Sequence, residues 1–373
     1  MHNVIVTVLI IAGEISGDLY ASYLCRAVKS AYPEQPIAGI GGEKLKEEVD
    51  TFLHETVHIH GVGIEAKIAS FRHKKSLESM LKKAIHTQSI SRVVIVDFQH
   101  YNQIIANVFT QHEIPIYTFI TPNFWMWKSC RQAKKICAYS KKIFTIFQPE
   151  YDFYKAMHTK TYYFGHPMTE IIPPIFYPIL KPKTHPTITL LPGSRPQEFK
   201  LYFKAMLQTL RLLRHDLPSI NIHICVSSSY YDNTIKQTLS NFNDLSCQLF
   251  YGNSSEILSQ SDLIFCASGS ATLEAVLLNK PLIVFAALPH LTYFIAKYIV
   301  KLPLTYISLP NFLTQSYLVP EFVQYDIKPK IIAQTALSIL RNPQQSVADY
   351  SKVKECLSLN QAIFANIAKE IMM

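Results

Sequence analysis

Short, continuously apolar runs rich in β-branched residues alternate with helical segments almost throughout this chain. The runs do not place a polar residue at every second position, which is typical of strands that are covered on both faces of their sheet. Such strands separated by helices predict parallel sheets in α/β layers. The predicted strands span residues 4–11, 37–40, 93–97, 115–120, 143–147, 161–164, 187–191, 220–226, 247–251, 263–266 and 281–285.

A proline-rich stretch divides these strands into two comparable sets. Residues 165–186 read GHPMTEIIPPIFYPILKPKTHP, with six prolines and no helical period. The chain of 373 residues is also longer than one core usually supports. We therefore predict two Rossmann-like domains, over 1–170 and 186–344, joined by a linker over 171–185. Ligands of open parallel sheets bind beyond the carboxyl ends of the strands, so a cleft between the two domains is expected.

Composition narrows the functional classes. Seven cysteines without a C-x-x-C pair disfavour a disulfide framework and a zinc site, and HIH at 58–60 lacks further ligands at suitable spacing, so no metal is expected. No apolar run reaches the roughly 18 residues that span a bilayer, and the first residues lack the pattern of a signal peptide. These features predict a cytoplasmic protein.

The formal net charge of +9 fits partners that are anionic: phosphorylated small molecules, an anionic lipid surface or nucleic acid. No nucleic-acid-binding motif is visible, so we predict no nucleic-acid partner. An incidentally basic protein remains the alternative.

Polar residues follow two strands of the first set. After the first strand, AGEISGD at 12–18 places Ser16, Gly17 and Asp18 where they can cap a helix that faces the cleft; a plain strand-to-helix turn is the alternative. After VVIV at 93–96 come Asp97 and His100, which a buried parallel strand would deliver to the same cleft. Either side chain is a candidate for taking a proton from a substrate.

The second set carries two loops suited to anions. LLPGSRPQE at 190–198 has Gly193 for close backbone approach, Ser194 with the following amides, and the Arg195 guanidinium; a capped turn with an exposed arginine is the alternative. CASGSATLEA repeats the arrangement at 266–275 with the small loop 268–270. Glu274 then lies where it can accept from ribose hydroxyls, or simply complement a helix start. Two such loops favour a nucleotide diphosphate.

Three further segments bear on binding. FITPNFWMWKSCRQAKK at 119–135 and AKIASFRHKK at 66–75 combine aromatic or apolar residues with cations, which together favour contact with an anionic lipid surface. The alternatives are a solvated helix face for each segment and, for 119–135, aromatic rings that stack on bases or line a sugar site. YISLPNFL at 306–313 places Asn311 after a short strand, either as a turn residue or facing the cleft.

The chain resembles the lipid-A-disaccharide synthases, bacterial glycosyltransferases of the two-domain GT-B type. AGEISGD, GIGGEKL, FGHPM, LLPGSRPQE, ASGSATLEA and SLPNFL match the family's motifs in order over nearly the whole length. The resemblance implies metal-independent, inverting transfer of diacylglucosamine from UDP to the 6-hydroxyl of diacylglucosamine 1-phosphate, at the cytoplasmic face of the inner membrane and without a cofactor. It also implies that the C-terminal segment, from about 345 to 373, packs back on the first domain.

Site residues carried over from the family's motifs fall into two groups. The donor group is expected to bind UDP: Gly193, Ser194, Arg195, Glu198, Ser268, Gly269, Ser270, Ala271, Thr272, Glu274 and Asn311. The acceptor group is expected to lie in the first domain: Gly13, Glu14, Ser16, Gly17, Asp18 and Asn102. Asp97, His100 and Arg195 are the expected catalytic residues.

The sequence departs from the family pattern at the expected base. The family reads D-x-P-D-F-N where this chain reads DFQHYN at 97–102, so the second aspartate is replaced by His100. A histidine is a competent base near neutral pH, with Asp97 available to orient it. The family usually has a basic residue shortly after PLIV, whereas this chain continues with FAAL and has none there. Ser316 occupies a position at which the family usually has arginine. Two alternatives therefore stay open: a UDP-sugar-binding paralogue without turnover, and another UDP-sugar enzyme such as an epimerase.

Overall fold

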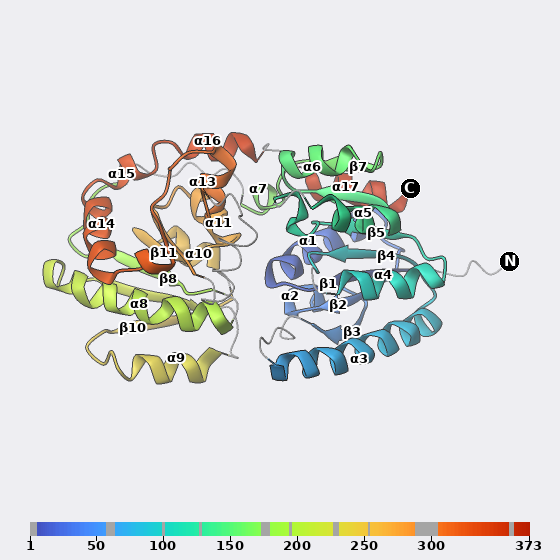
Figure 1. Ribbon diagram of the computed structural model, residues 1–373, viewed down its shortest axis with the longest axis horizontal. Coiled ribbons are helices and arrows are strands. Elements are labelled where there is room, and N and C mark those ends of the chain that lie inside the picture. The colour runs from blue at the N-terminus through green and yellow to red at the C-terminus, as the bar shows by residue number, and fades with distance from the viewer. Residues whose placement is uncertain are drawn as a thin grey trace. The chain divides into compact units, whose positions relative to one another are not determined.

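The computed structural model describes residues 6–56, 64–98, 101–126, 129–172, 180–193, 196–226, 231–252, 254–287, 305–357 and 362–373. The chain forms two compact units (Figure 1). The first unit consists of Met1–Glu170 and Leu357–Met373, and the second unit of Ile171–Cys356.

The first unit is built on a seven-stranded parallel sheet in the order β3-β2-β1-β4-β5-β6-β7. Its strands are β1 Thr7–Ala12, β2 Ile37–Gly41, β3 Thr51–Glu55, β4 Ile90–Val96, β5 Ile116–Phe119, β6 Ser140–Thr145 and β7 Thr161–Tyr163. Its helices are α1 Ile15–Ala31, α2 Glu43–Lys46, α3 Ile64–Gln88, α4 Asn102–Gln111, η1 Asn123–Trp125, α5 Cys130–Tyr139, α6 Gln148–Lys155, α7 Met168–Ile171 and α17 Ile363–Met372. Buried apolar residues of α3, α4, β1 and β4 form one core cluster, because these strands are apolar on both faces.

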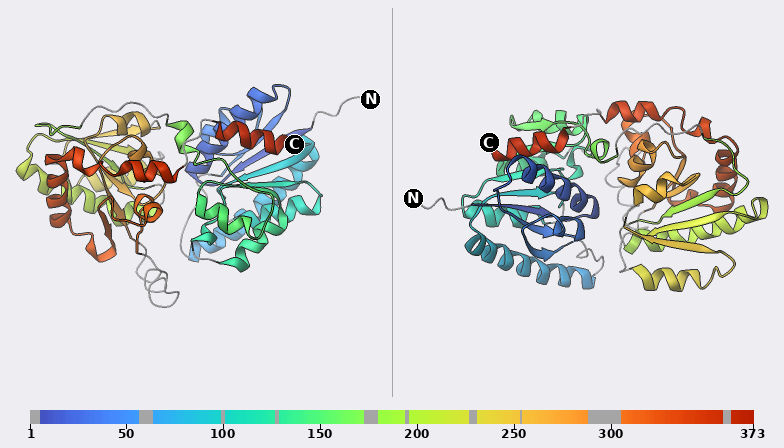
Figure 2. Two further views of the ribbon diagram at one scale, coloured as in Figure 1. Left: turned by 90° about the horizontal axis from the view of Figure 1, so that it is seen from above. Right: turned by 180° about the vertical axis from the view of Figure 1, so that it is seen from behind.

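The last helix belongs to the first unit, although it follows the second unit in sequence. Figures 1 and 2 show α17 beside α1. The Phe364 ring stacks on Tyr23 with 5.5 Å between centroids, and the Lys142 ammonium lies 2.9 Å from the Glu370 carboxylate. Arg92 Nη1 donates to the carbonyl oxygen of Ile371 at 2.7 Å. These contacts tie α17 to α1, β4 and β6.

The second unit repeats the design with six parallel strands in the order β10-β9-β8-β11-β12-β13. Its strands are β8 Thr187–Leu191, β9 Asn221–Val226, β10 Cys247–Tyr251, β11 Leu263–Ala267, β12 Leu282–Ala286 and β13 Glu321–Val323. Its helices are α8 Pro196–Asp216, α9 Asp232–Leu239, α10 Ser254–Ser259, α11 Ala271–Leu277, α13 Leu309–Thr314, η4 Gln324–Asp326, α14 Pro329–Arg341, α15 Pro343–Ser346 and α16 Tyr350–Cys356. Buried side chains of α8, α9 and α14 pack with those of the strands in a second core cluster.

The predicted class, parallel α/β with two Rossmann-like sheets, is confirmed, and the eleven strands predicted for the two sets are present. The short strand expected directly before Asn311 is not formed, because residues 306–308 lie outside any strand and Asn311 lies in the helix that follows them. Two strands, β3 and β13, were not predicted from the sequence. Both lie at sheet edges and are only partly buried, so they lack the continuous apolar run that marks the inner strands. Within the described parts of the chain, no helix has the length and apolarity that crossing a bilayer requires.

Each sheet has one point at which the strand order reverses. It lies between β1 and β4 in the first unit and between β8 and β11 in the second. Open α/β sheets bind ligands beyond the carboxyl ends of the strands at such a switch point. The topology therefore points to two loop clusters, one in each unit, as candidate ligand sites.

Candidate functional site

At the switch point of the first unit, two separately predicted motifs meet. Asp97 is the first residue after β4, and the Ser16 hydroxyl in the first turn of α1 donates to Asp97 Oδ2 at 3.2 Å. The Asp97 backbone has a left-handed φ of 43°, and its N–H donates to the carbonyl oxygen of Phe119 at 3.1 Å. Asp97 is thus held from two sides at the carboxyl edge of the sheet.

Gly17 makes this meeting possible. A Cβ atom at this position would lie 3.0 Å from Asp97 Cβ and 3.1 Å from the carbonyl oxygen of Val96. Such distances are tighter than ordinary packing allows, so a side chain would push the first turn of α1 away from the end of β4. The glycine therefore serves close approach of the helix to the strand.

The prediction that Ser16, Gly17 and Asp18 cap a helix is wrong, because α1 already begins at Ile15 and its N-cap residue is Glu14. Asp18 is buried, and its carboxylate accepts backbone N–H groups of the segment that begins α2. These donors are Gly42 at 2.6 Å, Lys44 at 3.0 Å and Leu45 at 3.2 Å. Burial raises the pKa of Asp18, and the N–H donors oppose that rise. Asp18 accordingly anchors the turn after β2.

The segment after Asp97 is described only in part. Gln99 and His100 lie outside the described residues, so the place of the expected base stays a prediction. Asn102 begins α4 and is buried, and neither its amide nitrogen nor its amide oxygen has a hydrogen-bond partner among the described residues. A buried amide in that condition has donor and acceptor capacity left for a ligand or an ordered water molecule.

At the switch point of the second unit, the loop after β8 turns sharply. Gly193 has a φ of 110°, a backbone conformation that favours glycine, and α8 begins three residues later at Pro196. Ser194, Arg195 and the side chain of Glu198 lie outside the described residues. The turn and the helix start that a phosphate loop needs are present, while the predicted arginine contact stays untested.

The loop after β11 is braced by its own hydroxyl groups. The Ser268 hydroxyl donates to the carbonyl oxygen of Ile307 at 3.1 Å, and the Thr272 hydroxyl donates to that of Gly269 at 2.7 Å. A Cβ atom at Gly269 would meet nothing within 4 Å, so the loop borders open space there. Ser270 and Ala271 then begin α11.

Glu274 faces a pair of serines that the sequence reasoning missed. The Ser254 and Ser255 hydroxyls, at the start of α10, donate to Glu274 Oε1 at 2.9 Å and 2.5 Å. The Glu274 side chain is buried, which raises its pKa, while the two hydroxyls oppose that rise. Its other oxygen, Oε2, has no hydrogen-bond partner among the described residues. The signal for the pair was a turn followed by two serines directly after a strand, at 251–255.

Asn311 has a structural place. It is fully buried, and its amide nitrogen donates to the carbonyl oxygen of Val319 at 2.8 Å and to Glu321 Oε2 at 3.1 Å. Its amide oxygen accepts the N–H groups of Leu318 and Val319 at 2.8 Å and 2.9 Å. These four bonds use the full capacity of the amide, so Asn311 shapes the loop before β13 and has nothing left for a donor sugar.

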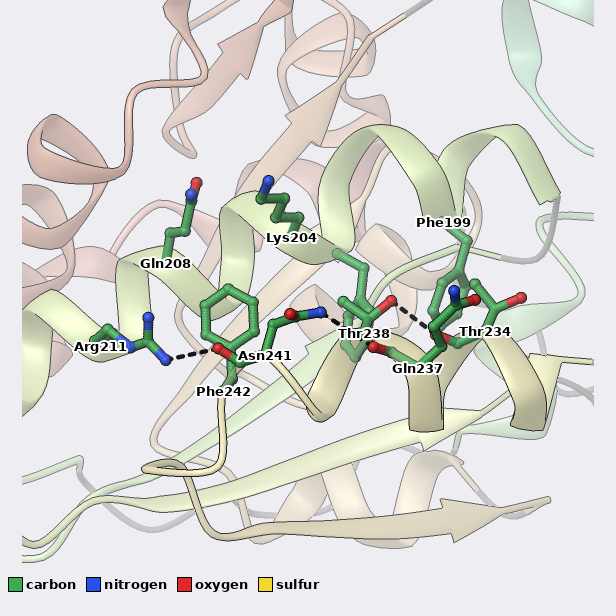
Figure 3. A pocket seen from close by; sticks show the side chains of 10 residues that line it. Phe199, Lys204, Gln208, Arg211, Thr234, Gln237, Thr238, Asn241 and Phe242 are labelled. Carbon is green, nitrogen blue, oxygen red and sulfur yellow. Dashed lines mark hydrogen bonds between the residues drawn. The ribbon is translucent and has the colours of Figure 1, made fainter.

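A surface groove of about 560 Å3 lies between α8 and α9 (Figure 3). Arg211, at one end, is held by the Asp244 carboxylate and lies 4.4 Å from the centroid of the Phe242 ring. The groove otherwise presents mainly amide and hydroxyl side chains, such as Gln237, with Lys204 as a further cation. It does not involve the loops after β8 or β11, so we do not assign the nucleotide to it.

A donor set for a metal ion is not found among the residues that the structure describes, since no three His, Cys, Asp or Glu side chains gather there. The histidines at 58 and 60 lie outside those residues.

The comparisons with known proteins agree with this geometry. The model of the family described as lipid-A-disaccharide synthetase matches residues 8–372. A lipid-A-disaccharide synthase of Synechocystis sp. is 30% identical over 94% of this chain and 93% of the relative. Among solved structures, the putative UDP-N-acetylglucosamine 2-epimerase of Listeria monocytogenes has a TM-score of 0.64 at 10% identity, covering 97% and 94% of the two chains. MurG of Acinetobacter baumannii has a TM-score of 0.55 at 12% identity, covering 98% and 99%. At such identities the two structures show a shared fold alone.

Proposed function

Because the chain belongs to the lipid-A-disaccharide synthetase family, and is thus a glycosyltransferase of lipid A disaccharide synthesis, we propose its substrates and mechanism as follows. The donor is UDP-2,3-diacylglucosamine and the acceptor is 2,3-diacylglucosamine 1-phosphate. The products are the lipid A disaccharide 1-phosphate and UDP. The observation that carries the proposal is the family match over residues 8–372, which runs through both units and both switch points.

The second unit is proposed to bind the UDP part of the donor. Gly193, the start of α8 and Arg195 would bind the diphosphate at the end of β8. The open loop at Gly269 would bind it at the end of β11. Glu274 would accept ribose hydroxyls through Oε2, because the two serines already hold Oε1. A carboxylate fixed in this way is oriented before the donor arrives, which lowers the entropic cost of binding.

The first unit is proposed to bind the acceptor and to supply the base. The acceptor's 6-hydroxyl oxygen forms a bond to C1 of the donor sugar, the bond from C1 to the phosphate oxygen breaks, and UDP leaves with its electron pair. The hydroxyl proton passes to His100, and the Asp97 carboxylate, braced by Ser16, balances the imidazolium charge. Attack opposite the leaving group inverts the configuration at C1. Loop amides and Arg195 stabilise the departing diphosphate.

We expect this reaction at the cytoplasmic face of the inner membrane, with the protein bound peripherally. The net charge of +9 supports attraction to anionic lipid. In the segment at 119–135, Trp125 is buried and is not available to a membrane, whereas Arg131, Lys134 and Lys135 are exposed and supply cations for an anionic surface.

The direct test is an assay of the purified protein with the UDP-diacylglucosamine donor and the 1-phosphate acceptor. We expect disaccharide and UDP in equal amounts. If UDP binds but no disaccharide forms between about pH 6 and 9, the protein is a binding paralogue and the proposal fails. Turnover of UDP-N-acetylglucosamine without any need for acyl chains would instead indicate another UDP-sugar enzyme.

The proposed base has its own prediction. We expect His100→Ala to lower turnover by about 100-fold or more while UDP affinity stays unchanged, because the general base is lost and the UDP loops are not touched. His100→Asp should keep part of the activity, since a carboxylate can take the same proton. Steady-state kinetics and UDP titration calorimetry measure the two effects. Unchanged turnover in the alanine variant would remove His100 from the mechanism and leave Asp97 as the base.

A further inference from the structure

One buried carboxylate in the first unit takes no part in the proposed reaction. Glu150, in the first turn of α6, is 1% exposed. Its Oε1 accepts both the N–H of Thr121 at 3.1 Å and the Thr121 hydroxyl at 2.5 Å. Its Oε2 accepts the N–H groups of Ile146 and Phe147 at 2.8 Å and 3.3 Å. The carboxylate therefore fastens the segment after β5 to the segment after β6, at the carboxyl edge of the sheet.

The segment after β5 needs such a fastening. Ile120, the first residue after β5, is buried and has a φ of 66°. A β-branched residue in this region of backbone space costs on the order of 1–3 kcal/mol and persists only where its surroundings hold it. The two hydrogen bonds from Thr121 to Glu150 fix the very next residue. Glu150 thus offsets the strain of this turn.

The same turn is connected to Asp97 through backbone. Val96 pairs with Phe119 in the register of β4 and β5, and the next N–H along β4, that of Asp97, donates to the Phe119 carbonyl oxygen at 3.1 Å. The N–H of Ile120 donates in turn to the Phe144 carbonyl oxygen on β6 at 3.0 Å. A change in the Ile120 turn would therefore move the Phe119 carbonyl group, which accepts the hydrogen bond from the Asp97 N–H.

On its other side, the turn leads to the first tryptophan of the chain. Trp125 is buried and packs on Phe147, with 5.8 Å between ring centroids. Phe147 also contacts His166 at 5.0 Å, and His166 meets Tyr20 of α1 at 6.2 Å. Glu150 holds the Phe147 backbone directly, so one carboxylate supports both ends of the segment from Ile120 to Trp125.

We propose that Glu150 is a positioning residue for the acceptor side of the reaction, holding the Ile120 turn so that Asp97 and the Trp125 segment keep their working geometry. The inference rests on the proposed function. Glu150 is not proposed to contact a substrate. Its carboxylate acts through Thr121 and the end of β5.

The ionisation of Glu150 makes this role measurable. Burial raises the pKa of Glu150 to about 7, and the Thr121 and backbone donors oppose that rise. The titratable groups around it stay neutral at that pH. Burial raises the pKa values of Tyr154 on the same helix and of Cys137 and Tyr139 on α5, and burial lowers the pKa of His166, which packs on Phe147, to about 3.

Activity and stability should then respond to pH in opposite directions. Only the ionised carboxylate accepts all four donors, so turnover should rise as the pH passes upward through about 7. The pKa of Glu150 in the folded state lies above the ordinary glutamate value of 4.5, so the folded state binds the extra proton and stability falls as the pH rises from about 4.5 to about 7. If Glu150 only stabilised the fold, turnover and the free energy of unfolding would change with pH in the same direction.

Tryptophan emission tests the proposal without any substrate. The chain has two tryptophans, at 125 and 127, so its intrinsic emission reports on this segment. We expect a change in emission with a midpoint near pH 7 that is absent in Glu150→Gln. We also expect the variant to lose at least about tenfold in kcat at pH 8, with UDP affinity unchanged because UDP binds the second unit.

A matched pair at Thr121 keeps the proposal testable if Glu150→Gln does not fold. Thr121→Val removes the hydroxyl that donates to Glu150, and we expect lower kcat and altered emission. Thr121→Ser keeps the hydroxyl and should restore both. Equal behaviour of the two variants, with wild-type emission and kcat, would overturn the proposal.

Asp50→Asn is the control, because Asp50 also accepts a backbone N–H, that of Ile37, but at the start of β2 and so at the opposite edge of the sheet. It should leave emission and kcat unchanged. If Glu150→Gln keeps the wild-type emission titration, or loses activity only in proportion to its unfolded fraction, Glu150 is not a positioning residue. If the wild type makes no disaccharide, the proposed function fails, whereas the emission titration still decides whether Glu150 controls the segment.

Discussion

At the scale of single residues, glycines show why side-chain patterns alone understate a site. A Cβ atom at Gly13 would lie 2.0 Å from Cδ2 of the Phe98 ring, which is itself buried. The AGEISGD motif therefore has a packing requirement in addition to the acceptor-binding role proposed for it. We expect Gly13→Ala to lower the free energy of unfolding by about 1–3 kcal/mol, because overpacking strains a dense core.

Urea unfolding measures that loss, and a double variant identifies its cause. Phe98→Leu makes room for the new methyl group, so Gly13→Ala combined with Phe98→Leu should lose less stability than the sum of the single changes. Strictly additive losses would place the strain elsewhere.

Asn311 gives the second residue-scale prediction. Since its amide makes four internal hydrogen bonds, Asn311→Ala should cost at least about 2 kcal/mol of stability by leaving buried groups unpaired. UDP affinity, measured by calorimetry well below the lowered Tm, should stay within about twofold. A large loss of UDP affinity at unchanged stability would return Asn311 to the donor site.

At the scale of elements, α17 explains how a lysine can lie buried within a strand. Lys142 sits in the middle of β6 and is buried, although lysine is rarely buried without a partner. Its ammonium donates to the Glu370 carbonyl oxygen at 2.6 Å and to the Glu370 carboxylate at 2.9 Å, so the last helix supplies that partner. The link between them spans 228 positions and cannot be read from local pattern.

The anchoring of α17 is testable through Phe364, which is buried and contacts both Tyr23 and Phe119. We expect Phe364→Ala to cost about 3–5 kcal/mol of local packing and to expose the last helix to proteolysis before the rest of the chain unfolds. Limited proteolysis with mass spectrometry detects the early cut. Lys369→Ala, on the exposed side of the same helix, is the control, and its last helix should be cleaved at the wild-type rate by a protease that does not cut after lysine.

At the scale of the whole molecule, periodicity predicted the inner strands and the two-sheet class, and the resemblance of six motifs predicted the family; the structure and the family match confirm these predictions. Periodicity did not predict the features that depend on contacts between segments far apart in the sequence. β3 and β13 gain their order from one neighbouring strand each. Asp18 was predicted as a helix cap and Glu150 was not singled out, because the backbone N–H groups that each carboxylate accepts lie in other segments. Such contacts join segments that local pattern cannot pair.

The net charge belongs to this scale too. We expect the protein to sediment with vesicles that contain anionic phospholipid and not with neutral phosphatidylcholine vesicles, and to be released by about 0.5 M salt, because salt screens surface charge. Equal binding to neutral vesicles at every salt concentration would show that apolar insertion, and not charge, holds the protein.

The return of α17 to the first unit also sets an order in time. The second unit is one continuous stretch, Ile171–Cys356, while the first unit needs residues from both sides of it. A ribosome finishes the second unit before it makes α17, so the amino-terminal half waits with Lys142 and the surface around Phe119 uncovered. The part of the chain that is synthesised first is thus completed last.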